Sequence, residues 1–368
     1  MTEHPRAIAV FVSFSGTGGV ERMIVNLIRG FVDLGQPVDL VLVRDESPHL
    51  KRLPLEVNLV RLDTDHTFLA IPALARYLRE RRPFALLAAK DRAGRAAVLA
   101  RRLARTDTRI VMRLGTNLST AMADKSTFAR WLRYRPIRWL YPQVNQIVAV
   151  SDGVAEDTAA IARVPRERIR VIRNPVVTPE LEKLAAEPCD YAWFHPGQPS
   201  IIVGAGRFQR QKDFPTLIRA FAQVQAQRPC RLVILGDGGG QAKLETLIST
   251  LGLEGLVDLP GFQTNPYSYL ARANLFVLSS AWEGSPNVLT EAMALGTPVV
   301  STDCPSGPRE LLDGGRYGPL VAVGDVNGLA SAIAKTLDHH LPPAALKAAV
   351  AEYNQSESAT KYLHALRA

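Results

Sequence analysis

The chain has 368 residues, of which 47% are hydrophobic and 21% are charged, and its formal net charge is +9. This length predicts two domains, each large enough to bury its own core, and the composition is that of an ordinary soluble globular protein. No run of about 18 apolar residues is present, which excludes a transmembrane helix. The start of the chain passes directly into a strand-like run, so we expect no signal peptide.

The three cysteines are far apart and match no metal-binding pattern. We therefore expect reduced thiols in a cytoplasmic protein.

The first half of the chain holds a concentrated basic segment. Residues 76–138 contain 17 Lys and Arg against 4 Asp and Glu, so the segment carries +13 and the rest of the chain carries −4. Such a segment indicates an anionic partner, which could be a nucleic acid, a membrane surface or a phosphorylated substrate. An arginine-rich surface that is merely solvated would give the same composition.

In chain order, the first half alternates short apolar strands with amphipathic helices. Residues 20–34 repeat apolar side chains at the helical period and stop before Gly35, which predicts a helix. The alternation predicts right-handed βαβ units and a parallel sheet. The expected strands are 8–14, 38–43, 57–61, 85–90, 109–113, 146–150 and 169–172.

The pattern breaks at Asn174 and Pro175, and residues 186–200 are rich in Pro and Gly, as is typical of a connector. The sequence therefore predicts an α/β fold of two consecutive Rossmann-like domains, 1–175 and 176–355. Ligands of such sheets bind at the carboxyl ends of the strands, so the loops there are the candidates for chemistry. The expected strands of the second half are 201–205, 231–235, 256–259, 274–278, 298–301 and 320–321.

The loop after the first strand contains Gly16, Gly18 and Gly19. Glycines let the backbone approach a ligand, and the following helix offers free N–H groups and the positive end of its dipole. This combination suits an anion such as a diphosphate, although the complete dinucleotide-binding pattern is missing. A tight turn without a ligand explains the same glycines.

The loop after the first strand of the second half contains Gly206, Arg207 and Lys212. Two cations at the carboxyl end of a strand can clamp a diphosphate and neutralise the charge that grows on a leaving group. An exposed basic loop is the plainer interpretation, but the position at the expected ligand-binding edge favours a function.

Residues 282–291 carry the most specific signal, two glutamates at Glu283 and Glu291. Ser285 suits an N-cap and Pro286 a first helical residue, so Glu283 is expected in a loop and Glu291 about two turns into a helix. Apolar neighbours indicate that Glu291 is enclosed, where it could accept hydrogen bonds from ribose hydroxyls. A helix N-terminus can bind phosphate, and the amides concerned belong to Asn287, Val288 and Leu289.

Together these motifs resemble those of the retaining glycosyltransferases of family 4, which have the GT-B fold of two Rossmann-like domains facing a cleft. The resemblance covers nearly the whole chain, and the ordered set is specific although each piece alone is not. Residues 303–310 are similar to members that build bacterial surface polysaccharides. The other motifs are the glycine loop at 16–19, Ala-x-Gly-Arg to Lys at 205–212, Leu-Gly-Asp-Gly at 235–238, Pro-Gly-Phe at 260–262, Glu-x7-Glu at 283–291 and Gly-Thr-Pro-Val-Val at 296–300.

The resemblance implies a UDP- or GDP-sugar donor bound to the C-terminal half, no cofactor, no metal ion and retention of the anomeric configuration. It also implies a glycan or polyprenyl-diphosphate-linked acceptor, used in cell-surface polysaccharide or lipopolysaccharide assembly. The last helix, about 356–368, would cross back onto the N-terminal domain.

The same resemblance implies roles for the motif residues. Arg207 and Lys212 would hold the diphosphate as its charge grows. Glu291 would bind the ribose and Glu283 would lie near the hydroxyls of the donor sugar. The glycine loop at 16–19 would approach the diphosphate from the N-terminal side.

One departure from the family concerns the loop after the fifth strand. Many members carry a His there that contacts the transferred sugar, but residues 113–117 contain none. Arg113 or Asn117 could substitute for it, which leaves the donor sugar open.

Residues 128–141 interleave arginines with aromatic residues. Trp and Tyr suit the headgroup level of a bilayer and Arg suits anionic lipid, so we expect peripheral contact with the inner face of the plasma membrane. In the alternative, Pro136 interrupts the helix and the tryptophans pack into the core. The residues expected to contact the membrane are Trp131, Arg133, Arg135, Arg138 and Trp139.

Three other functions fit parts of the sequence. A GT-B epimerase would need acid/base carboxylates and His around the sugar, and a phosphorylase would need a pyridoxal-bearing lysine and a longer chain. A nicotinamide-dependent oxidoreductase would need an acidic residue about 20 positions after a complete glycine fingerprint, which the second half lacks. A nucleic-acid partner is disfavoured by the carboxylate-rich second half and by the lack of a recognised binding module.

Overall fold

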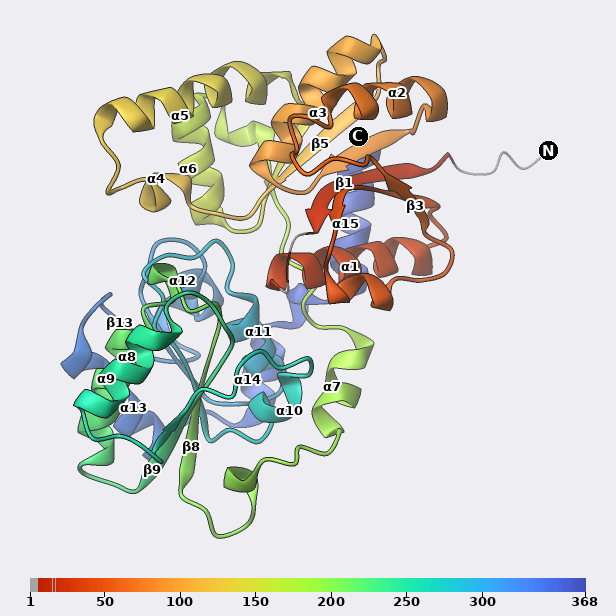
Figure 1. Cartoon of the computed structure of the whole chain (residues 1–368). Coiled ribbons are helices and arrows are strands. Elements are labelled where there is room, and N and C mark those ends of the chain that lie inside the picture. Colours follow the sequence, from red (N-terminus) through yellow and green to blue (C-terminus); the bar gives the residue numbers. More distant parts are fainter. Residues whose placement is uncertain (1–5, 15, 17) are drawn as a thin grey trace. The chain divides into compact units, whose positions relative to one another are not determined.

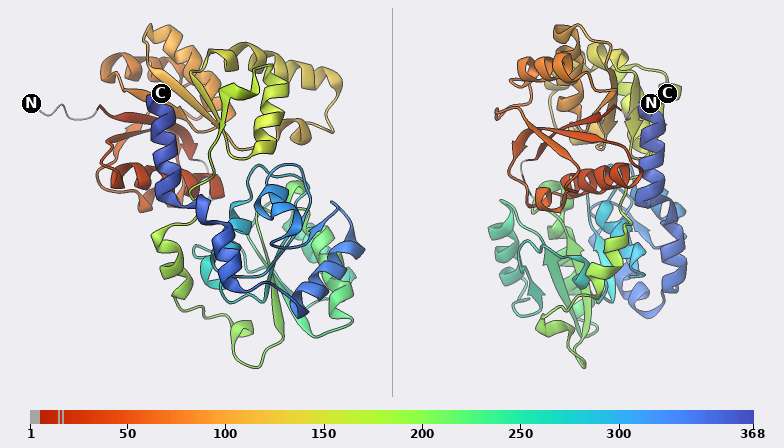
Figure 2. Two further views of the ribbon diagram at one scale, coloured as in Figure 1. Left: turned by 180° about the vertical axis from the view of Figure 1, so that it is seen from behind. Right: turned by 90° about the vertical axis from the view of Figure 1, so that its right-hand side faces the viewer.

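The computed structural model describes residues 6–14, 16 and 18–368. The chain forms two compact units (Figures 1 and 2). The first unit runs to Pro175 and also includes Asn354–Ala368, and the second unit is Val176–Tyr353.

The first unit is built on a seven-stranded parallel sheet in the order β3-β2-β1-β4-β5-β6-β7. Each strand expected from the sequence is present, because apolar runs bounded by turn residues mark buried parallel strands well. The strands are β1 (Ile8–Phe14), β2 (Val38–Asp45), β3 (Asn58–Arg61), β4 (Ala85–Ala88), β5 (Arg109–Leu114), β6 (Gln146–Ala149) and β7 (Ile169–Val171).

Helices cover both faces of this sheet. One apolar core joins the sheet to α1 and to the C-terminal helix α15, and the other joins it to α2, α3, α5 and α6. The expected last helix is therefore present and packs on the first sheet (Figure 1). The helices are α1 (Gly19–Asp33), α2 (Ile71–Arg81), α3 (Asp91–Ala104), α4 (Leu118–Ala121), α5 (Thr127–Leu140), α6 (Asp152–Ala162) and α15 (Gln355–Arg367), with short 3-10 turns η1 (Pro48–Arg52), η2 (Tyr141–Gln143) and η3 (Arg166–Arg168).

The second unit repeats the plan with a six-stranded parallel sheet in the order β10-β9-β8-β11-β12-β13. Its strands also agree with those expected from the sequence. They are β8 (Ser200–Ala205), β9 (Cys230–Leu235), β10 (Val257–Asp258), β11 (Leu275–Leu278), β12 (Val299–Thr302) and β13 (Leu320–Val321).

Two apolar cores lie on the two faces of the second sheet. One contains α8, α9 and α13, and the other contains α7, α10, α11, α12 and α14. The helices are α7 (Pro179–Ala186), α8 (Phe214–Gln225), α9 (Gln241–Thr250), α10 (Tyr267–Leu270), α11 (Asn287–Ala294), α12 (Pro308–Leu311), α13 (Val326–Asp338) and α14 (Pro343–Ala349), with 3-10 turns η4 (Ala192–Phe194), η5 (Arg210–Lys212), η6 (Asp313–Gly315) and η7 (Ala351–Tyr353).

No helix among the described residues is long and apolar enough to span a bilayer.

Candidate active site

The strand order of the second sheet reverses between β8 and β11, which lie side by side in parallel. In doubly wound sheets this switch point opens a crevice at the carboxyl ends of the strands, where ligands bind. The loops that follow these two strands are residues 206–213 and 279–286. They carry Gly206, Arg207, Lys212 and Glu283, so the fold brings the candidate donor residues of both motifs to one edge.

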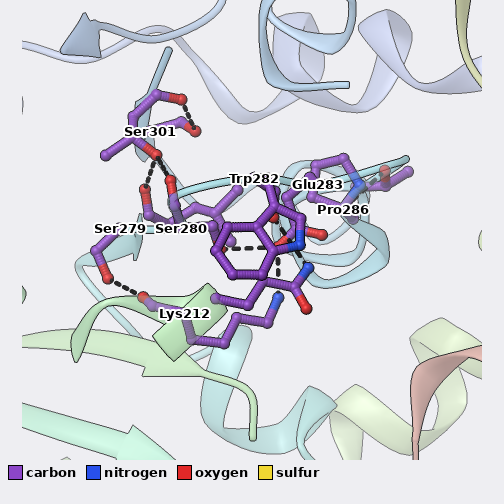
Figure 3. Close-up of polar contacts among 11 residues, drawn as sticks. Lys212, Ser279, Ser280, Trp282, Glu283, Pro286 and Ser301 are labelled. Carbon is purple, nitrogen blue, oxygen red and sulfur yellow. Dashed lines mark hydrogen bonds and ion pairs between the residues drawn. The ribbon is translucent and has the colours of Figure 1, made fainter. Parts of the chain in front are cut away.

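An ion pair joins the two loops. The ammonium Nζ of Lys212 lies 2.6 Å from Oε1 of Glu283, and the hydroxyl of Ser280 donates to the same oxygen at 2.7 Å (Figure 3). Ser280 and the Glu283 side chain are almost wholly buried, whereas the Lys212 side chain is 18% exposed. The Lys212 side chain is thus both paired and partly exposed.

Three further hydrogen bonds fix the backbones of these loops to each other. The Ser279 hydroxyl donates to the Lys212 carbonyl at 2.7 Å, and the Ala281 amide donates to the Gln211 carbonyl at 2.8 Å. The Gln211 side chain donates back to the Trp282 carbonyl at 2.9 Å. The two loops therefore act as one body rather than as independent segments.

Gly206 is required by its surroundings. Its φ of +154° is rare for other residues, and a Cβ atom would lie 2.7 Å from Cε of Lys212. Behind it, a Cβ on Gly236 would lie 2.0 Å from the Gly206 carbonyl oxygen, so the Leu-Gly-Asp-Gly turn supports this loop by close backbone packing. The amide of Phe208 also donates to the Asp237 carbonyl at 2.7 Å.

Arg207 is exposed, and its side chain makes no ion pair with any residue that the structure describes. Its guanidinium is free to meet an anion at the same edge.

The helix after the second loop begins one residue later than expected. Pro286 is the N-cap of α11 and Asn287 its first residue, so the assignment of Ser285 as N-cap was wrong. The ψ angle of Pro286 is 89°, which is not helical, so the helix begins at the next residue, Asn287. Glu291 is the fifth helical residue, little more than one turn into the helix, and it is buried as expected.

The helix start is only partly available for phosphate. The amide of Leu289 already donates to the Pro286 carbonyl at 3.0 Å, and its side chain is fully buried. Asn287 and Val288 are half-buried and remain the more accessible of the three residues. A Cβ on Gly307, whose φ is +97°, would lie 2.6 Å from Pro286 Cδ, so residues 303–310 brace this turn.

Sequence reasoning missed the residues that hold the ion pair, Ser279 and Ser280. Two hydroxyl residues directly after an apolar strand were a usable signal, because they lie at the edge where ligands bind. It also missed Cys304, which is buried beside Glu283. Burial and, secondarily, the Glu283 carboxylate raise the pKa of the Cys304 thiol to about 12, so this thiol stays protonated.

The glycine loop of the first unit is only partly described, since residues 15 and 17 lie outside the described residues. Gly18 is the N-cap of α1 and accepts the amide of Glu21 at 3.1 Å. A Cβ on Gly16 would meet nothing within 4 Å, so its surroundings are open. Gly19 is exposed at the first position of α1.

Helix α5 has two distinct faces. Its outer face consists of Phe128, Trp131, Leu132, Arg135 and Trp139, which are all exposed. Exposed fractions of 46% for Trp131 and 56% for Trp139 contradict the alternative in which the tryptophans fill the core. We call this set the outer face of α5.

The other two arginines that were expected to contact a membrane, Arg133 and Arg138, point toward neighbouring parts of the first unit. Arg133 donates to Asp91 at 2.5 Å, and Arg138 donates to the Ile161 carbonyl at 3.1 Å. Both hold α5 to its neighbours, so the interpretation of Arg133 and Arg138 as membrane contacts does not fit the structure.

Pro136 does not interrupt α5, contrary to the alternative drawn from the sequence. The ring removes the donor that would pair with the Leu132 carbonyl. Leu132 lies on the exposed side of the helix, where water can solvate that carbonyl.

Asp91, the first residue of α3, is the centre of a second polar cluster. It accepts two bonds from Arg95 at 2.9 and 3.0 Å, the bond from Arg133, and one from the Tyr141 hydroxyl at 2.8 Å. Burial alone would raise the pKa of Asp91, but the bonds and charges of Arg95 and Arg133 outweigh it and hold that pKa below its usual value.

Comparison with known proteins decides the family. The model described as "Glycosyltransferase Family 4" matches residues 17–179, and the one described as "Glycosyl transferases group 1" matches residues 199–339. A Campylobacter jejuni enzyme, N-acetylgalactosamine-N,N'-diacetylbacillosaminyl-diphospho-undecaprenol 4-alpha-N-acetylgalactosaminyltransferase, is 31% identical over 333 residues, 88% of this chain and 87% of its own. The chain belongs to glycosyltransferase family 4.

Other similar proteins agree with this assignment. The lipopolysaccharide core biosynthesis glycosyltransferase LpsD of Rhizobium meliloti is 28% identical over 89% of this chain and 87% of its own. The uncharacterized glycosyltransferase MJ1059 of Methanocaldococcus jannaschii is 32% identical, but the match spans only 52% of either chain. The crystal structure of Anabaena HepE in complex with UDP and glucose has a TM-score of 0.72 at 19% identity, over 97% of this chain and 95% of that one, which shows the shared GT-B fold.

The two residues expected to replace the family's missing His have structural roles in this glycosyltransferase. Arg113 is 3% exposed, and its guanidinium donates to Asn174 at 2.9 Å beside Tyr362 of α15. Asn117 is the buried N-cap of α4 and accepts the Thr120 amide at 3.1 Å. Neither placement favours direct contact with a bound sugar.

Among the described residues, no group of three or more His, Cys, Asp and Glu is placed to hold a metal ion. The acidic pair Asp63 and Asp65 lies in an exposed loop after β3 of the first unit, where Arg44 pairs with Asp65.

Proposed function

We propose that this glycosyltransferase moves a sugar, with retention of configuration, from a UDP-sugar to a lipid-linked diphosphate acceptor in the assembly of a surface glycan. The observation that carries the proposal is the gathering of Arg207, Lys212 and Glu283 at the switch point of the second sheet. The name of the Campylobacter relative supports a diphospho-undecaprenol acceptor, LpsD supports a lipopolysaccharide-type product, and the HepE complex supports UDP over GDP.

In this proposal, residues 176–355 are the donor domain and residues 1–175 with 356–368 are the acceptor domain. Arg207 and Lys212 neutralise the diphosphate, and Gly206 lets its backbone approach. The amides of Asn287 and Val288 contact phosphate, and Glu291 accepts the ribose hydroxyls. Gly16, Gly18 and Gly19 stay predicted contacts of a diphosphate.

The chemical step asks little of acid or base side chains. The bond between the anomeric carbon and the diphosphate oxygen breaks, and both electrons stay on the diphosphate, where the cations of Arg207 and Lys212 stabilise them. The acceptor hydroxyl forms the new bond on the same face of the sugar, and its proton passes to the departing phosphate oxygen. A metal ion is not required if the two cations supply this stabilisation.

The binding half of the proposal is tested by thermal unfolding with UDP, GDP and their sugar conjugates. A ligand at about 100 times its Kd stabilises the folded state by about 2.7 kcal/mol, so UDP and UDP-sugars should raise the melting temperature. Glu291→Ala should abolish most of that rise. Lys335→Ala is the matched control, because Lys335 is exposed in the last turn of α13.

The transfer half is tested by incubating the best UDP-sugar with a synthetic polyprenyl-diphosphate sugar and detecting a longer lipid-linked product. UDP release that requires the acceptor supports a transferase, whereas conversion of the donor sugar without acceptor supports the epimerase alternative. If GDP raises the melting temperature and UDP does not, the proposed donor becomes a GDP-sugar.

We further propose that the outer face of α5 contacts an anionic membrane. Phe128, Trp131, Leu132 and Trp139 present an apolar stripe, and Arg135 stacks on the Trp131 ring at 5.1 Å within it. Aromatic side chains suit the headgroup level and Arg attracts anionic lipid. A lipid-linked acceptor gives this contact a purpose and locates the enzyme at the inner face of the plasma membrane.

Flotation with phosphatidylglycerol vesicles tests the contact. Wild-type protein should float with anionic but not with phosphatidylcholine vesicles, and Trp131→Ser with Arg135→Glu should prevent flotation. Arg219→Glu, an exposed charge reversal on α8 of the second unit, is the control and should float. Flotation that is unaffected by the α5 variant would assign membrane contact to another surface.

A further inference from the structure

One of the two cations expected to hold the donor diphosphate, Lys212, is already paired with a carboxylate in the structure. Lys212 Nζ lies 2.6 Å from Glu283 Oε1, and the two side chains are 18% and 8% exposed. Opposite charges attract more strongly at a partly buried position than in bulk water, because the surroundings are less polarisable. A diphosphate that approaches Lys212 must therefore compete with the carboxylate of Glu283.

The two partners are held to different degrees. The Glu283 carboxylate accepts a hydrogen bond from the hydroxyl of the buried Ser280 at 2.7 Å. The backbone amide of Glu283 donates to the Pro305 carbonyl at 3.3 Å. The backbone carbonyl of Lys212 accepts a hydrogen bond from Ser279, but the ammonium group lies at the end of a flexible four-carbon side chain. If the pair opens, Lys212 moves and Glu283 stays in place.

We propose that Glu283 and Lys212 form an exchangeable ion pair by which the enzyme distinguishes the intact sugar nucleotide from the nucleoside diphosphate product. This inference rests on the proposed function. With the intact donor, the diphosphate takes Lys212, and hydroxyls of the sugar donate hydrogen bonds to the carboxylate that Lys212 has left. Both charges then have partners, so the opened pair costs little.

After transfer, the sugar and its hydroxyls are gone. Glu283 is then a buried carboxylate without those donors, close to a diphosphate of the same charge sign. The Glu283 carboxylate then forms its ion pair with Lys212 again, and the nucleoside diphosphate loses one of the two cations that bind it. The pair thereby weakens product binding specifically and favours release.

The test compares UDP binding by wild type and Glu283→Gln in a titration calorimeter. Glutamine has nearly the same shape and can still accept from Ser280, but it releases Lys212. Since one partly buried charge contact is exchanged, UDP should bind roughly tenfold tighter to Glu283→Gln. The best UDP-sugar of the thermal screen should gain nothing or bind more weakly. Glu254→Gln, an exposed carboxylate of the same unit, is the control and should leave both affinities unchanged.

A double-mutant cycle with Lys212→Ala separates exchange from plain repulsion. If Lys212 is the group exchanged, Glu283→Gln should tighten UDP binding much less in the Lys212→Ala background. Equal tightening in both backgrounds, or none with Lys212 present, would overturn the exchange and leave the proposed function intact. If GDP alone stabilises the wild type in the thermal screen, GDP takes the place of UDP in this titration. Failure to bind either nucleotide would contradict the proposed function, and the inference with it.

Discussion

Asp91 in the first unit and Glu283 in the second are both carboxylates that pair with cations, yet they are surrounded differently. Asp91 accepts four bonds from Arg95, Arg133 and Tyr141, which come from α3, α5 and η2. Glu283 accepts from Lys212 and Ser280 at one oxygen, Oε1, on a loop at the edge of the sheet.

From this difference we expect the Asp91 cluster to be structural and the Glu283 pair to be functional. The donors around Asp91 satisfy both of its oxygens and connect three elements, so the cluster holds α5 against α3. The pair at Glu283 joins two loops at a switch point, and its lysine can reach solvent. A carboxylate saturated by side chains stabilises the fold, whereas one held by an exchangeable cation can serve a ligand.

The largest expected effect concerns turnover. Arg207→Ala or Lys212→Ala should each lower kcat by about 10²–10³, the usual loss when one group that stabilises growing negative charge is removed. Asp91→Asn should leave kcat within about tenfold of wild type. Steady-state kinetics with folded variants measures this contrast, and wild-type turnover by both the Arg207 and Lys212 variants would remove the diphosphate clamp.

The second effect concerns stability, and here the change at Asp91 should matter more than the change at Glu283. Asp91→Asn removes charged hydrogen bonds to two arginines and should lower the free energy of unfolding by about 2–3 kcal/mol. Glu283→Gln should lower it by less, because its lysine gains access to water. Urea unfolding followed by circular dichroism compares them; an Asp91 variant as stable as wild type would show that the cluster does not hold the fold.

Several of these features were predictable from the sequence and others were not. Strands and motif loops are local patterns, so Gly206 and Glu283 were correctly expected on loops after β8 and β11. The Lys212–Glu283 pair joins residues 71 positions apart, and no local pattern reveals that contact. Likewise, Arg113 was a candidate for contact with the sugar, but the fold buries it and pairs its guanidinium with Asn174 beside Tyr362 of α15.

A smaller effect is expected from Gly206→Ala. The added Cβ would lie 2.7 Å from Lys212 Cε and requires a rare φ of +154°, so it should displace the ammonium without removing its charge. We expect kcat/KM to fall roughly tenfold, since partial misplacement of a charge costs less than its removal. Gly239→Ala, where a Cβ meets nothing within 4 Å, is the control in the same unit. Equal kcat/KM for the two variants would contradict the role of Gly206.

The stabilisation that Asp91 provides should depend on pH. The pKa of Asp91 is lower in the folded protein than in the unfolded chain, so its stabilising effect is complete above the unfolded pKa and is lost as pH falls through the folded value. Wild type should therefore lose its stability advantage over Asp91→Asn below about pH 4. Unfolding curves at pH 7 and at successive acidic values measure the difference; a constant gap would place the stabilisation elsewhere.

The smallest expected effect is that of chelation, and it tests whether the cations of the second unit suffice. Transferases that depend on a metal use it to neutralise the diphosphate, a task that the proposal gives to Arg207 and Lys212. EDTA should therefore leave kcat unchanged in wild type. Lys212→Ala gives the sharper comparison: Mg²⁺ should restore some of its lost turnover by supplying charge in solution, while leaving wild type unaffected. Loss of wild-type activity in EDTA with rescue by Mn²⁺ or Mg²⁺ would show that the ion, rather than the two side chains, stabilises the leaving diphosphate.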